Sequence, residues 1–264
     1  MTRPSEPERI STLATAQRLQ ALLRPDVTWV PSPDGFMDAL PGVTVPPPGR
    51  AQAAWQTSLG ASLYQRVQRV VAALLAPGYA TIAAQLQLRP GQTVVDVGCG
   101  PGNVTNRLAD AVGPHGMAVG VDLSAPMLAL AARQSRPNIG LLRADATRLP
   151  LRDHSVDSAC ATAVIMLVPE PVDALTEMIR VVAPGGWLLV MVPCRPDGPA
   201  AAVTGPLTDL LGHFGGARMF NPDDLAILLE KLGCARIYSR QQYNMLTVRA
   251  RAPIATRDRK STSP

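Results

Sequence analysis

The sequence has few of the residues from which metal centres and disulfide frameworks are built. It contains four cysteines and three histidines in 264 residues, and no two cysteines form a CxxC pair. This spacing lacks the paired ligands of a zinc site, and a chain of this size without an export signal rarely relies on disulfides. We therefore expect four buried thiols, at Cys99, Cys160, Cys194 and Cys234, and no metal.

Long apolar runs are also missing. No stretch approaches the ~18 to 20 consecutive apolar residues of a membrane-spanning helix. The first ten residues, MTRPSEPERI, are polar and carry both signs of charge, unlike a secretory signal. The sequence thus predicts a cytoplasmic protein without a membrane span.

Positive charge is in excess, but it is unevenly placed. The net charge is +5, and residues 249–264 hold five Arg or Lys residues and one Asp, whereas residues 1–49 hold four Arg and five acids. Aromatic residues make up only 4% of the chain, and no stripe of alternating basic and aromatic residues stands out. We therefore place the excess in a basic tail, which makes a nucleic acid an unlikely partner.

Composition divides the chain into four parts. Residues 1–50 form a proline-rich, partly ordered leader with one short helix at 8–23. Residues 51–90 are expected to form an N-terminal helical cap, because residues 55–75 have apolar positions at helical intervals, followed by a second helix over residues 79–88. The main domain is expected to span residues 91–252, and residues 253–264 a disordered basic tail.

The main domain alternates between strands and helices. Strands that are apolar at nearly every position and separated by helices indicate a parallel sheet covered on both faces. A helix beginning at Asn221 and two strands joined by a short turn follow. The pattern predicts a Rossmann-like, doubly wound α/β fold with a mostly parallel seven-stranded sheet, an antiparallel C-terminal hairpin and an N-terminal helical cap. The expected strands are 93–97, 117–122, 139–143, 156–162, 187–192, 235–240 and 245–251.

The stretch VVDVGCGPGN, residues 94–103, ends a strand in three closely spaced glycines. Glycines here let a ligand approach the backbone, and the next helix offers its free N–H groups. The alternative is a tight turn that holds no ligand. Two further strands end in acids, at Asp122 and Asp145, and Asp96 lies within the first strand. Three acids at neighbouring strand ends suit a ligand with a diol, an exocyclic amine and a positive charge.

Other nucleotide sites fit less well. The sixth position of a G-x-G-x-x-G fingerprint is Asn103 here, and Asp96 would lie beneath a pyrophosphate as a like charge. A nicotinamide or flavin site is therefore disfavoured, and a P-loop pattern is absent.

Four segments in order carry a family resemblance: VVDVGCGPGN, VGVDLSAPML, RADATRLPLRDHSVDSACATAV and MIRVVAPGGWLLVMV. Together, over roughly residues 79–192, they resemble the successive motifs of the class I S-adenosylmethionine-dependent methyltransferases. The branch that looks most similar is that of the small-molecule enzymes of ubiquinone and menaquinone biosynthesis. The helix and hairpin over residues 219–251 also resemble the end of that fold.

The resemblance implies S-adenosylmethionine as the cofactor and a role for each matching residue. The glycine turn would wrap the methionine part, with Asp96 on its ammonium side. Asp122 would bind the ribose hydroxyls, Asp145 the adenine amino group, and the end of the fourth strand would form the floor of the site. The implied cofactor-binding set is Asp96, Gly98, Cys99, Gly100, Gly102, Asn103, Asp122, Leu123, Met127, Asp145, Ala146, Ala161 and Thr162.

No general base is evident. After the fourth strand the chain reads ATAVIMLVPEP, which is apolar where related enzymes often carry a polar residue, and this favours an apolar acceptor. The candidates for contact with the acceptor are His213, Tyr64 and Tyr79. Cys194 has no basic neighbour that would activate it as a nucleophile.

We therefore predict an enzyme that transfers a methyl group in line from S-adenosylmethionine to a small, apolar or lipid-like acceptor. Two alternatives stay open. One is an RNA methyltransferase with a degenerate N-terminal module, because DGFMDALP (residues 34–41) is similar to a phrase in certain guanine-modifying ribosomal RNA methyltransferases. The other is a cofactor-binding protein without turnover, which the missing base would allow.

Overall fold

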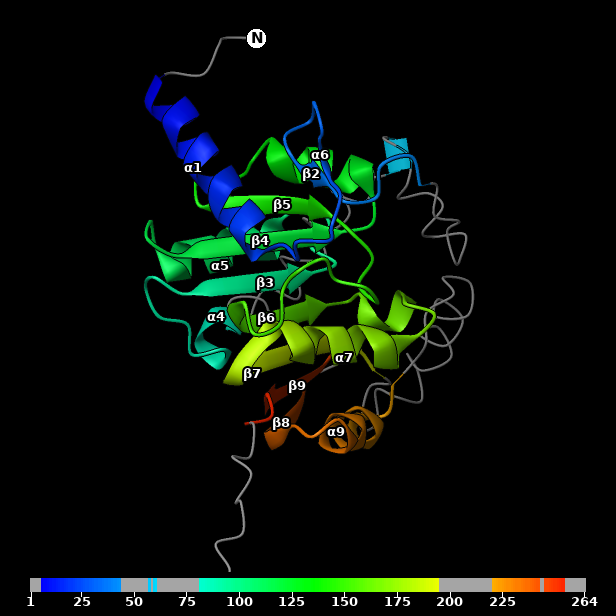
Figure 1. Ribbon diagram of the computed structural model, residues 1–264. Coiled ribbons are helices and arrows are strands. Elements are labelled where there is room, and N and C mark those ends of the chain that lie inside the picture. Colours follow the sequence, from blue (N-terminus) through cyan, green and yellow to red (C-terminus); the bar gives the residue numbers. More distant parts are fainter. Residues whose placement is uncertain are drawn as a thin grey trace, which may run out of the picture.

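The computed structural model describes residues 6–43, 57, 59–60, 81–194, 220–242 and 245–254. Its centre is a nine-stranded sheet of order β1-β2-β5-β4-β3-β6-β7-β9-β8 (Figure 1). The strands are β1 Val30–Pro31, β2 Met37–Asp38, β3 Thr93–Val97, β4 Met117–Asp122, β5 Ile139–Arg143, β6 Val156–Thr162, β7 Val182–Pro193, β8 Ala235–Gln242 and β9 Met245–Arg251. The helices are α1 Glu6–Leu22, α4 Ile82–Gln85, α5 Asn103–Val112, α6 Ala125–Ala132, the 3₁₀ turn η1 Ile165–Leu167, α7 Pro171–Val181 and α9 Pro222–Lys231.

The sheet is parallel from β2 through β7 and antiparallel at both edges. The β2, β5, β4, β3, β6 and β7 strands pair in parallel, and β9 pairs antiparallel with both β7 and β8. All seven expected strands are present, and the doubly wound fold with a C-terminal hairpin is confirmed. The two extra strands, β1 and β2, each have two residues, which is too short to produce a periodic pattern in the sequence.

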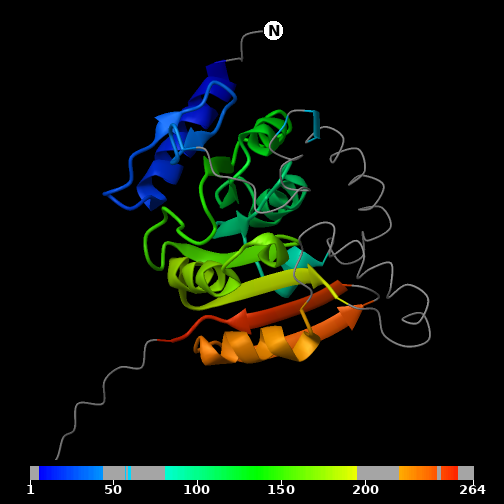
Figure 2. The same ribbon diagram turned by 90° about the vertical axis from the view of Figure 1, so that its right-hand side faces the viewer.

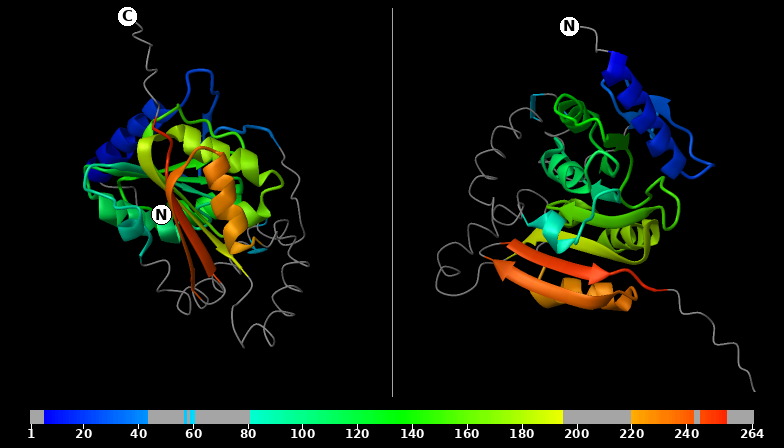
Figure 3. Two further views of the ribbon diagram at one scale, coloured as in Figure 1. Left: turned by 90° about the horizontal axis from the view of Figure 1, so that it is seen from below. Right: turned by 90° about the vertical axis from the view of Figure 1, so that its left-hand side faces the viewer.

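Helices cover the sheet on both faces because its strands are apolar on both sides. One buried cluster joins the sheet to α1, α7 and α9, through residues such as Leu19, Leu175 and Leu229. A second cluster joins the opposite face to α4, α5 and α6, through residues such as Leu86 and Leu108. Figures 2 and 3 show these two layers on either side of the strands.

The described part of the proline-rich leader packs against this sheet. Leu19 of α1 is 2% exposed, and a Cβ added at Gly140 of β5 would lie 3.1 Å from its Cδ2 atom. Arg18 donates to the carbonyl oxygens of Gly116 and His115, at 3.1 and 3.2 Å. A further strand, β2, pairs with β5. Residues 6–43 thus contribute to the domain's core and extend its sheet.

Other parts of the sequence-based organisation fall outside the described residues. Of the helix expected over residues 55–75, only residues 57 and 59–60 are described, and of the expected basic tail only residues 253–254 are described. The helix expected over residues 79–88 is seen as α4, Ile82–Gln85. Within the described ranges, no helix is both long enough and apolar enough to cross a bilayer.

Candidate functional site

The candidate site lies at one edge of the sheet, where four neighbouring parallel strands end. The order β5-β4-β3-β6 places the carboxyl ends of these strands side by side. From β3 the chain runs outward through β4 to β5 and then returns to the other side of β3 as β6. Such a reversal of strand order creates the crevice in which open α/β sheets bind ligands.

The glycine turn between β3 and α5 needs its glycines for conformation and for space. Gly98, Gly100 and Gly102 have φ values of 71°, 53° and 83°, in the left-handed region that disfavours other residues. A Cβ added to Gly98 would lie 2.3 Å from a methyl carbon of Val164. A Cβ added to Gly100 would meet no atom within 4 Å. The turn is therefore packed underneath at Gly98 and open at Gly100, as a cradle for a ligand would be.

Asp122, the last residue of β4, holds this turn. One carboxylate oxygen accepts from the Gly100 N–H and the other from the Ser124 N–H, both at 2.8 Å. Burial raises the pKa of Asp122, although the N–H groups of Ser124 and Gly100 oppose the rise. A carboxylate oxygen can accept more than one hydrogen bond. Asp122 can therefore fix the turn and still accept hydroxyl groups of a ligand.

Next to Asp122, the end of β5 supplies the second expected acid. One oxygen of Asp145 accepts from the N–H and the hydroxyl of Thr147, both at 2.8 Å, which closes a local turn. Asp145 and Ala146 are half-buried. Between the two acids, Ser124 caps α6 by accepting from the Met127 N–H at 3.3 Å. The structure therefore brings Asp122 and Asp145 to neighbouring strand ends, where the sequence placed them.

The third acid, Asp96, lies inside β3 beneath the glycine turn, as the sequence indicates. Its side chain is completely buried, and its oxygens accept from the Thr105 hydroxyl at 2.7 Å and the Cys160 thiol at 3.5 Å. Burial raises its pKa to about 6, and the hydrogen bonds from Thr105 and Cys160 oppose that rise. Its expected contact with the ammonium group of a ligand stays a prediction. Asp96 is the fourth of the five residues of β3, and its side chain is directed at Thr105 of α5.

In this place Asp96 supports the start of α5. The helix begins after Gly102, which has no side chain to cap it. The backbone N–H and hydroxyl of Thr105, in the first turn, both bond to Asp96. An acid near a helix N-terminus also interacts favourably with the helix dipole. Asp96 therefore orders the loop from inside the protein.

The end of β6 forms the floor beside the glycine turn. Ala161 is buried and Thr162 half-buried, and Ala163 has a φ of 54°, which is uncommon for a residue other than glycine. This bend carries Val164 onto Gly98. The following residues, Ile165, Met166 and Leu167 of η1, are apolar. The floor therefore offers a hydrophobic wall and no acid or base.

The acceptor-contacting candidates His213, Tyr64 and Tyr79 lie outside the described residues. All four cysteines are buried thiols, as expected. Burial raises the pKa of the Cys99 and Cys160 thiols well above the ordinary value, so neither is a ready nucleophile. The ranges that the structure covers contain no group of three potential metal ligands.

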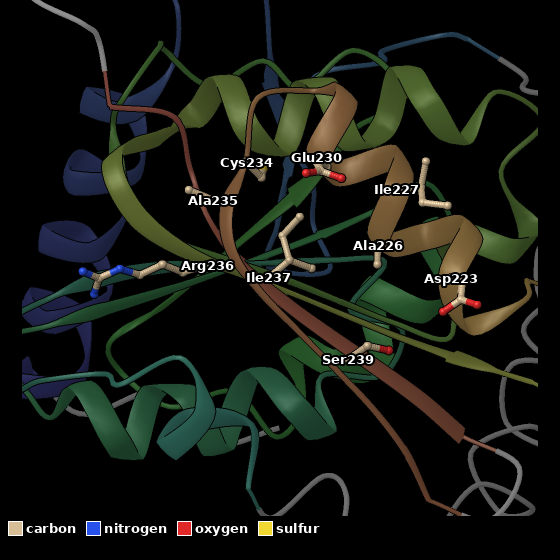
Figure 4. Close-up of a pocket in the computed structure, with 9 residues that line it drawn as sticks. All are labelled: Asp223, Ala226, Ile227, Glu230, Cys234, Ala235, Arg236, Ile237 and Ser239. Carbon is tan, nitrogen blue, oxygen red and sulfur yellow. The ribbon is translucent and has the colours of Figure 1, made fainter.

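A separate groove of about 620 Å³ lies between α9 and β8. Figure 4 shows Asp223, Ala226 and Glu230 of α9 beside Ile237 and Ser239 of β8. Its lining includes no residue of the glycine turn or of the neighbouring strand ends. It is therefore distinct from the candidate site.

Arg143 is a residue that sequence reasoning missed. It ends β5, and its guanidinium donates to the Leu123 carbonyl at 3.2 Å, to Asp38 at 3.0 Å and to the carbonyl oxygens of Leu40 and Val43 at 3.2 and 3.1 Å. It therefore joins the expected adenine-side loop to the N-terminal segment. These partners are 20 to 105 residues away in sequence, so no local pattern reveals the contact.

Comparison with known proteins points to one family. A family model described as "Methyltransferase domain" matches residues 95–190, which run from β3 into β7. A 37.1 kDa protein in transposon TN4556 of Streptomyces fradiae is 40% identical over 110 residues, which are 41% of this chain and 32% of that protein. The demethylmenaquinone methyltransferase of Shouchella clausii is 34% identical over 119 residues, 44% of this chain and 51% of the enzyme. The matched segments thus cover about a third to a half of these relatives.

Solved structures show the same fold. A crystal structure of an S-adenosylmethionine-dependent methyltransferase from Aquifex aeolicus superimposes with a TM-score of 0.54 at 21% sequence identity. The match covers 66% of this chain and 89% of that one. The strand order and the glycine turn with its aspartate partner thus occur in a segment, residues 95–190, that matches a methyltransferase family model, and the fold is that of a solved S-adenosylmethionine-dependent methyltransferase.

Proposed function

We propose that the protein binds S-adenosylmethionine at the glycine turn and transfers its methyl group to a small, apolar acceptor. The observation that carries the proposal is the hydrogen bond from Gly100 to Asp122, which fixes a glycine cradle beside a carboxylate at the reversal of strand order. This arrangement matches a ligand that joins an amino acid to a ribose.

Each part of the cofactor has a plausible partner among the described residues. Asp122 would accept the ribose hydroxyls, with Leu123 and Met127 near the adenine. Asp145 and Ala146 would receive the adenine edge. The backbone of Gly98, Cys99, Gly100 and Gly102, with the first turn of α5 at Asn103, would surround the methionine part, and Ala161 and Thr162 would lie beneath it. Asp96 would act indirectly, by holding α5.

The apolar wall after β6 supports a small, apolar acceptor. Val164, Ile165, Met166 and Leu167 follow the floor of the site directly. The relatives from Shouchella clausii and Staphylococcus aureus are named demethylmenaquinone methyltransferases, which agrees with an acceptor of quinone type. An apolar pocket also excludes water from the reacting atoms, which favours a reaction that neutralises charge.

When bound, the sulfonium cofactor supplies a methyl group that is already activated for displacement. The protein's task is to hold the acceptor oxygen or carbon in line with that methyl group, and such positioning can contribute about 7 to 11 kcal/mol to catalysis. The rigid packing of Val164 against Gly98 would keep the floor and the turn at a fixed separation. An acidic acceptor, such as a phenol or quinol, would need no strong general base.

The cofactor assignment can be tested with Asp122→Ala and the product analogue S-adenosylhomocysteine. Loss of a charged hydrogen-bond acceptor, worth about 1.5 to 3 kcal/mol, should weaken binding by about tenfold or more in calorimetry. Asp173→Asn, an exposed acid in the first turn of α7, is the control and should leave affinity unchanged. Equal affinities for Asp122→Ala and the unaltered chain would contradict the assignment.

Turnover requires a second measurement, because binding alone would also fit a cofactor-binding protein without activity. Incubation with methyl-labelled cofactor and a demethylated naphthoquinol, or a cell lipid extract, should release labelled product into the organic phase. Label appearing only in RNA would favour an RNA acceptor. Tight cofactor binding with no label transferred to either would favour the non-catalytic alternative.

A further inference from the structure

The C-terminal hairpin carries arginines and aromatic rings on one face. Residues paired across a sheet point to the same side, and the register pairs Tyr238 with Arg249, Arg240 with Thr247, and Trp187 with Arg251. Trp187 packs in the cluster on the α4 and α5 side of the sheet, so this face is opposite to α9. We call Tyr238, Arg240, Arg249 and Arg251 the arginine strip. Arg236 is counted with it because its charge lowers the pKa of Arg251, although Arg236 stands in the bulge at the base of the hairpin and lines the groove beside α9.

Stacking fixes the middle of the strip. The Arg249 guanidinium carbon lies 4.8 Å from the Trp187 ring centre and 4.5 Å from that of Tyr238. The guanidinium carbon of Arg251, which is also on β9, lies 3.9 Å from the centre of the Trp187 ring. One N–H of Arg249 donates to the Gln85 carbonyl at 3.1 Å, and Arg251 donates to the Gly185 carbonyl. A guanidinium has five N–H donors, so both arginines keep further donors in a fixed orientation.

The strip has no counter-charge among the described residues. The ion pairs found there join Arg24, Arg136, Arg143 and Arg180 to acids, and none involves Arg236, Arg240, Arg249 or Arg251. Burial lowers the pKa of Arg251, and the charges of Arg236, Arg249 and Arg89 lower it further. The four arginines, gathered without an acid among the described residues, repel one another, and a bound anion would relieve that repulsion.

A second, independent feature lies in the same cluster. Trp187 is 5% exposed, and its Nε1–H is buried without a hydrogen-bond partner in the described structure. Buried donors are almost always paired, and an unpaired one calls for an explanation. An acceptor atom brought by a ligand would supply the missing partner.

We propose that the arginine strip binds a single-stranded nucleic acid, with the arginines on its phosphates and Tyr238 against a base. Tyr238 is 51% exposed, so one face of its ring is free to stack while Arg249 covers the other. Proteins that bind single-stranded nucleic acids combine cations, which contact the phosphates, with aromatic rings, on which the bases stack. The binding would be independent of the acceptor of methyl transfer.

The shape of the strip favours an extended strand over a membrane surface. Its residues follow the neighbouring strands β8 and β9. The strip begins beside Trp187 of β7, which pairs with Arg251, and ends at Arg240, closer to the sheet edge that carries the glycine turn. Its exposed side chains are guanidiniums and one aromatic ring, without the exposed apolar residues that insertion into lipid needs. The C-terminal strands with α9 on their other side are visible in Figure 3.

The test is the fluorescence anisotropy of a labelled 12-nucleotide single-stranded RNA titrated with the full chain at several salt concentrations. Affinity should fall steeply with salt, because each phosphate contact contributes about −0.7 to the logarithmic slope for single strands. Arg236→Gln combined with Arg240→Gln, two exposed and unpaired positions, should weaken binding at least tenfold and make the slope shallower by about 1.4.

Arg133→Gln combined with Arg152→Gln is the matched control, because it removes the same charge at exposed positions near β5. It should change affinity by less than about twofold if the site is the strip. Tyr238→Ala should weaken binding about 5- to 100-fold without changing the salt slope, as expected for a lost base stack. Circular dichroism would verify that each variant folds.

Three results would overturn the proposal: no measurable RNA binding by the unaltered chain, a salt-independent affinity, or equal losses for the two double variants. Binding to vesicles of anionic lipid with none to RNA would also overturn it. None of these outcomes depends on methyl transfer, so a failure here is distinguishable from a failure of the proposed enzymatic function.

Discussion

At the scale of single residues, the environment of a side chain decides its role more than its type does. Asp96 and Asp122 are both aspartates of adjacent strands, Asp96 one residue before the end of β3 and Asp122 at the end of β4. Asp122 lies partly exposed beside the turn, whereas Asp96 is completely buried beneath α5. The strand register that turns Asp96 inward is a tertiary feature. Sequence reasoning therefore placed Asp96 within its strand but not its hydrogen bonds to Thr105 and Cys160, and the contact with a ligand stays a prediction.

The burial of Asp96 has a consequence for stability against pH. Its pKa is about 6 in the folded chain and near 3.8 when unfolded, so the folded state binds an extra proton between these values. Stability due to this group is therefore greatest below about pH 4 and is lost as pH rises through 6. The 2.2-unit difference corresponds to roughly 3 kcal/mol.

Asp96→Asn should remove this dependence, because an amide keeps the shape and does not ionise. The free energy of unfolding of the variant, relative to the unaltered chain, should rise between pH 4 and 6.5 and then level off. Urea denaturation at half-unit steps measures it, and the shared groups cancel in the difference. Parallel curves for the two proteins would show that Asp96 is not the titrating group.

At the scale of elements, most of the fold could be predicted because strands and helices leave periodic patterns. The seven long strands and the helix that begins after Asn221 were evident from residue type. The beginning of β7 differs, because pairing with β6 starts at Val182 and continues past Pro184 and Gly185 through an irregularity. A proline and two glycines predict a turn, and they form a bulge instead.

The glycine turn gives the sharpest prediction at this scale, because two of its glycines differ in their surroundings. Gly98→Ala should place a methyl group 2.3 Å from Val164 and also strain the backbone, so it should destabilise the domain by several kcal/mol and abolish cofactor binding. Gly100→Ala meets no neighbour and should cost only the backbone term, about 1 to 2 kcal/mol. Thermal denaturation compares the two.

A third variant tests the clash with Val164. Val164→Ala combined with Gly98→Ala removes the two methyl carbons at 2.3 and 2.8 Å but leaves the Cβ atom of residue 164 at 2.5 Å, so it should recover only part of the lost stability. If the double variant is no more stable than Gly98→Ala alone, contact with the Val164 side chain is not the reason that Gly98→Ala destabilises the domain.

At the scale of the whole molecule, contacts between distant segments escape a reading of the sequence. The excess of positive charge looked like a property of the tail, but Arg249 and Arg251 belong to β9 and share one face of the hairpin with Arg240. The missing aromatic–basic stripe is likewise present, but it is assembled across three strands. The sequence shows which residues of one strand share a face, but it does not show which residues of neighbouring strands are paired.

Arg143 links the N-terminal segment to the sheet and provides a test at this scale. Its hydrogen bonds to Asp38, Leu40, Val43 and Leu123 join two parts of the chain that are far apart. Arg143→Gln should lower the free energy of unfolding by about 2 to 4 kcal/mol, since several half-buried acceptors lose a charged donor together. It should also increase hydrogen exchange at the amides of residues 37–43.

The control is Arg136→Gln, which breaks an exposed pair with Asp110. Exposed pairs contribute about 0 to 1 kcal/mol, so this change should be nearly silent in both measurements. A loss of stability from Arg143→Gln without faster exchange at residues 37–43 would mean that the segment is held by other contacts.

The order β7-β9-β8 also determines when the sheet can be completed during synthesis. The outer strand β8 precedes β9 in the chain, yet β9 pairs between β7 and β8 and shields the backbone edge of β7 over Trp187–Pro193. A ribosome that stalls before residue 245 would release a chain whose longest apolar strand is open to pairing with other molecules. A chain that ends before β9 therefore has an open sheet edge and is prone to aggregate, whereas a chain that includes residues 245–251 can cover that edge itself.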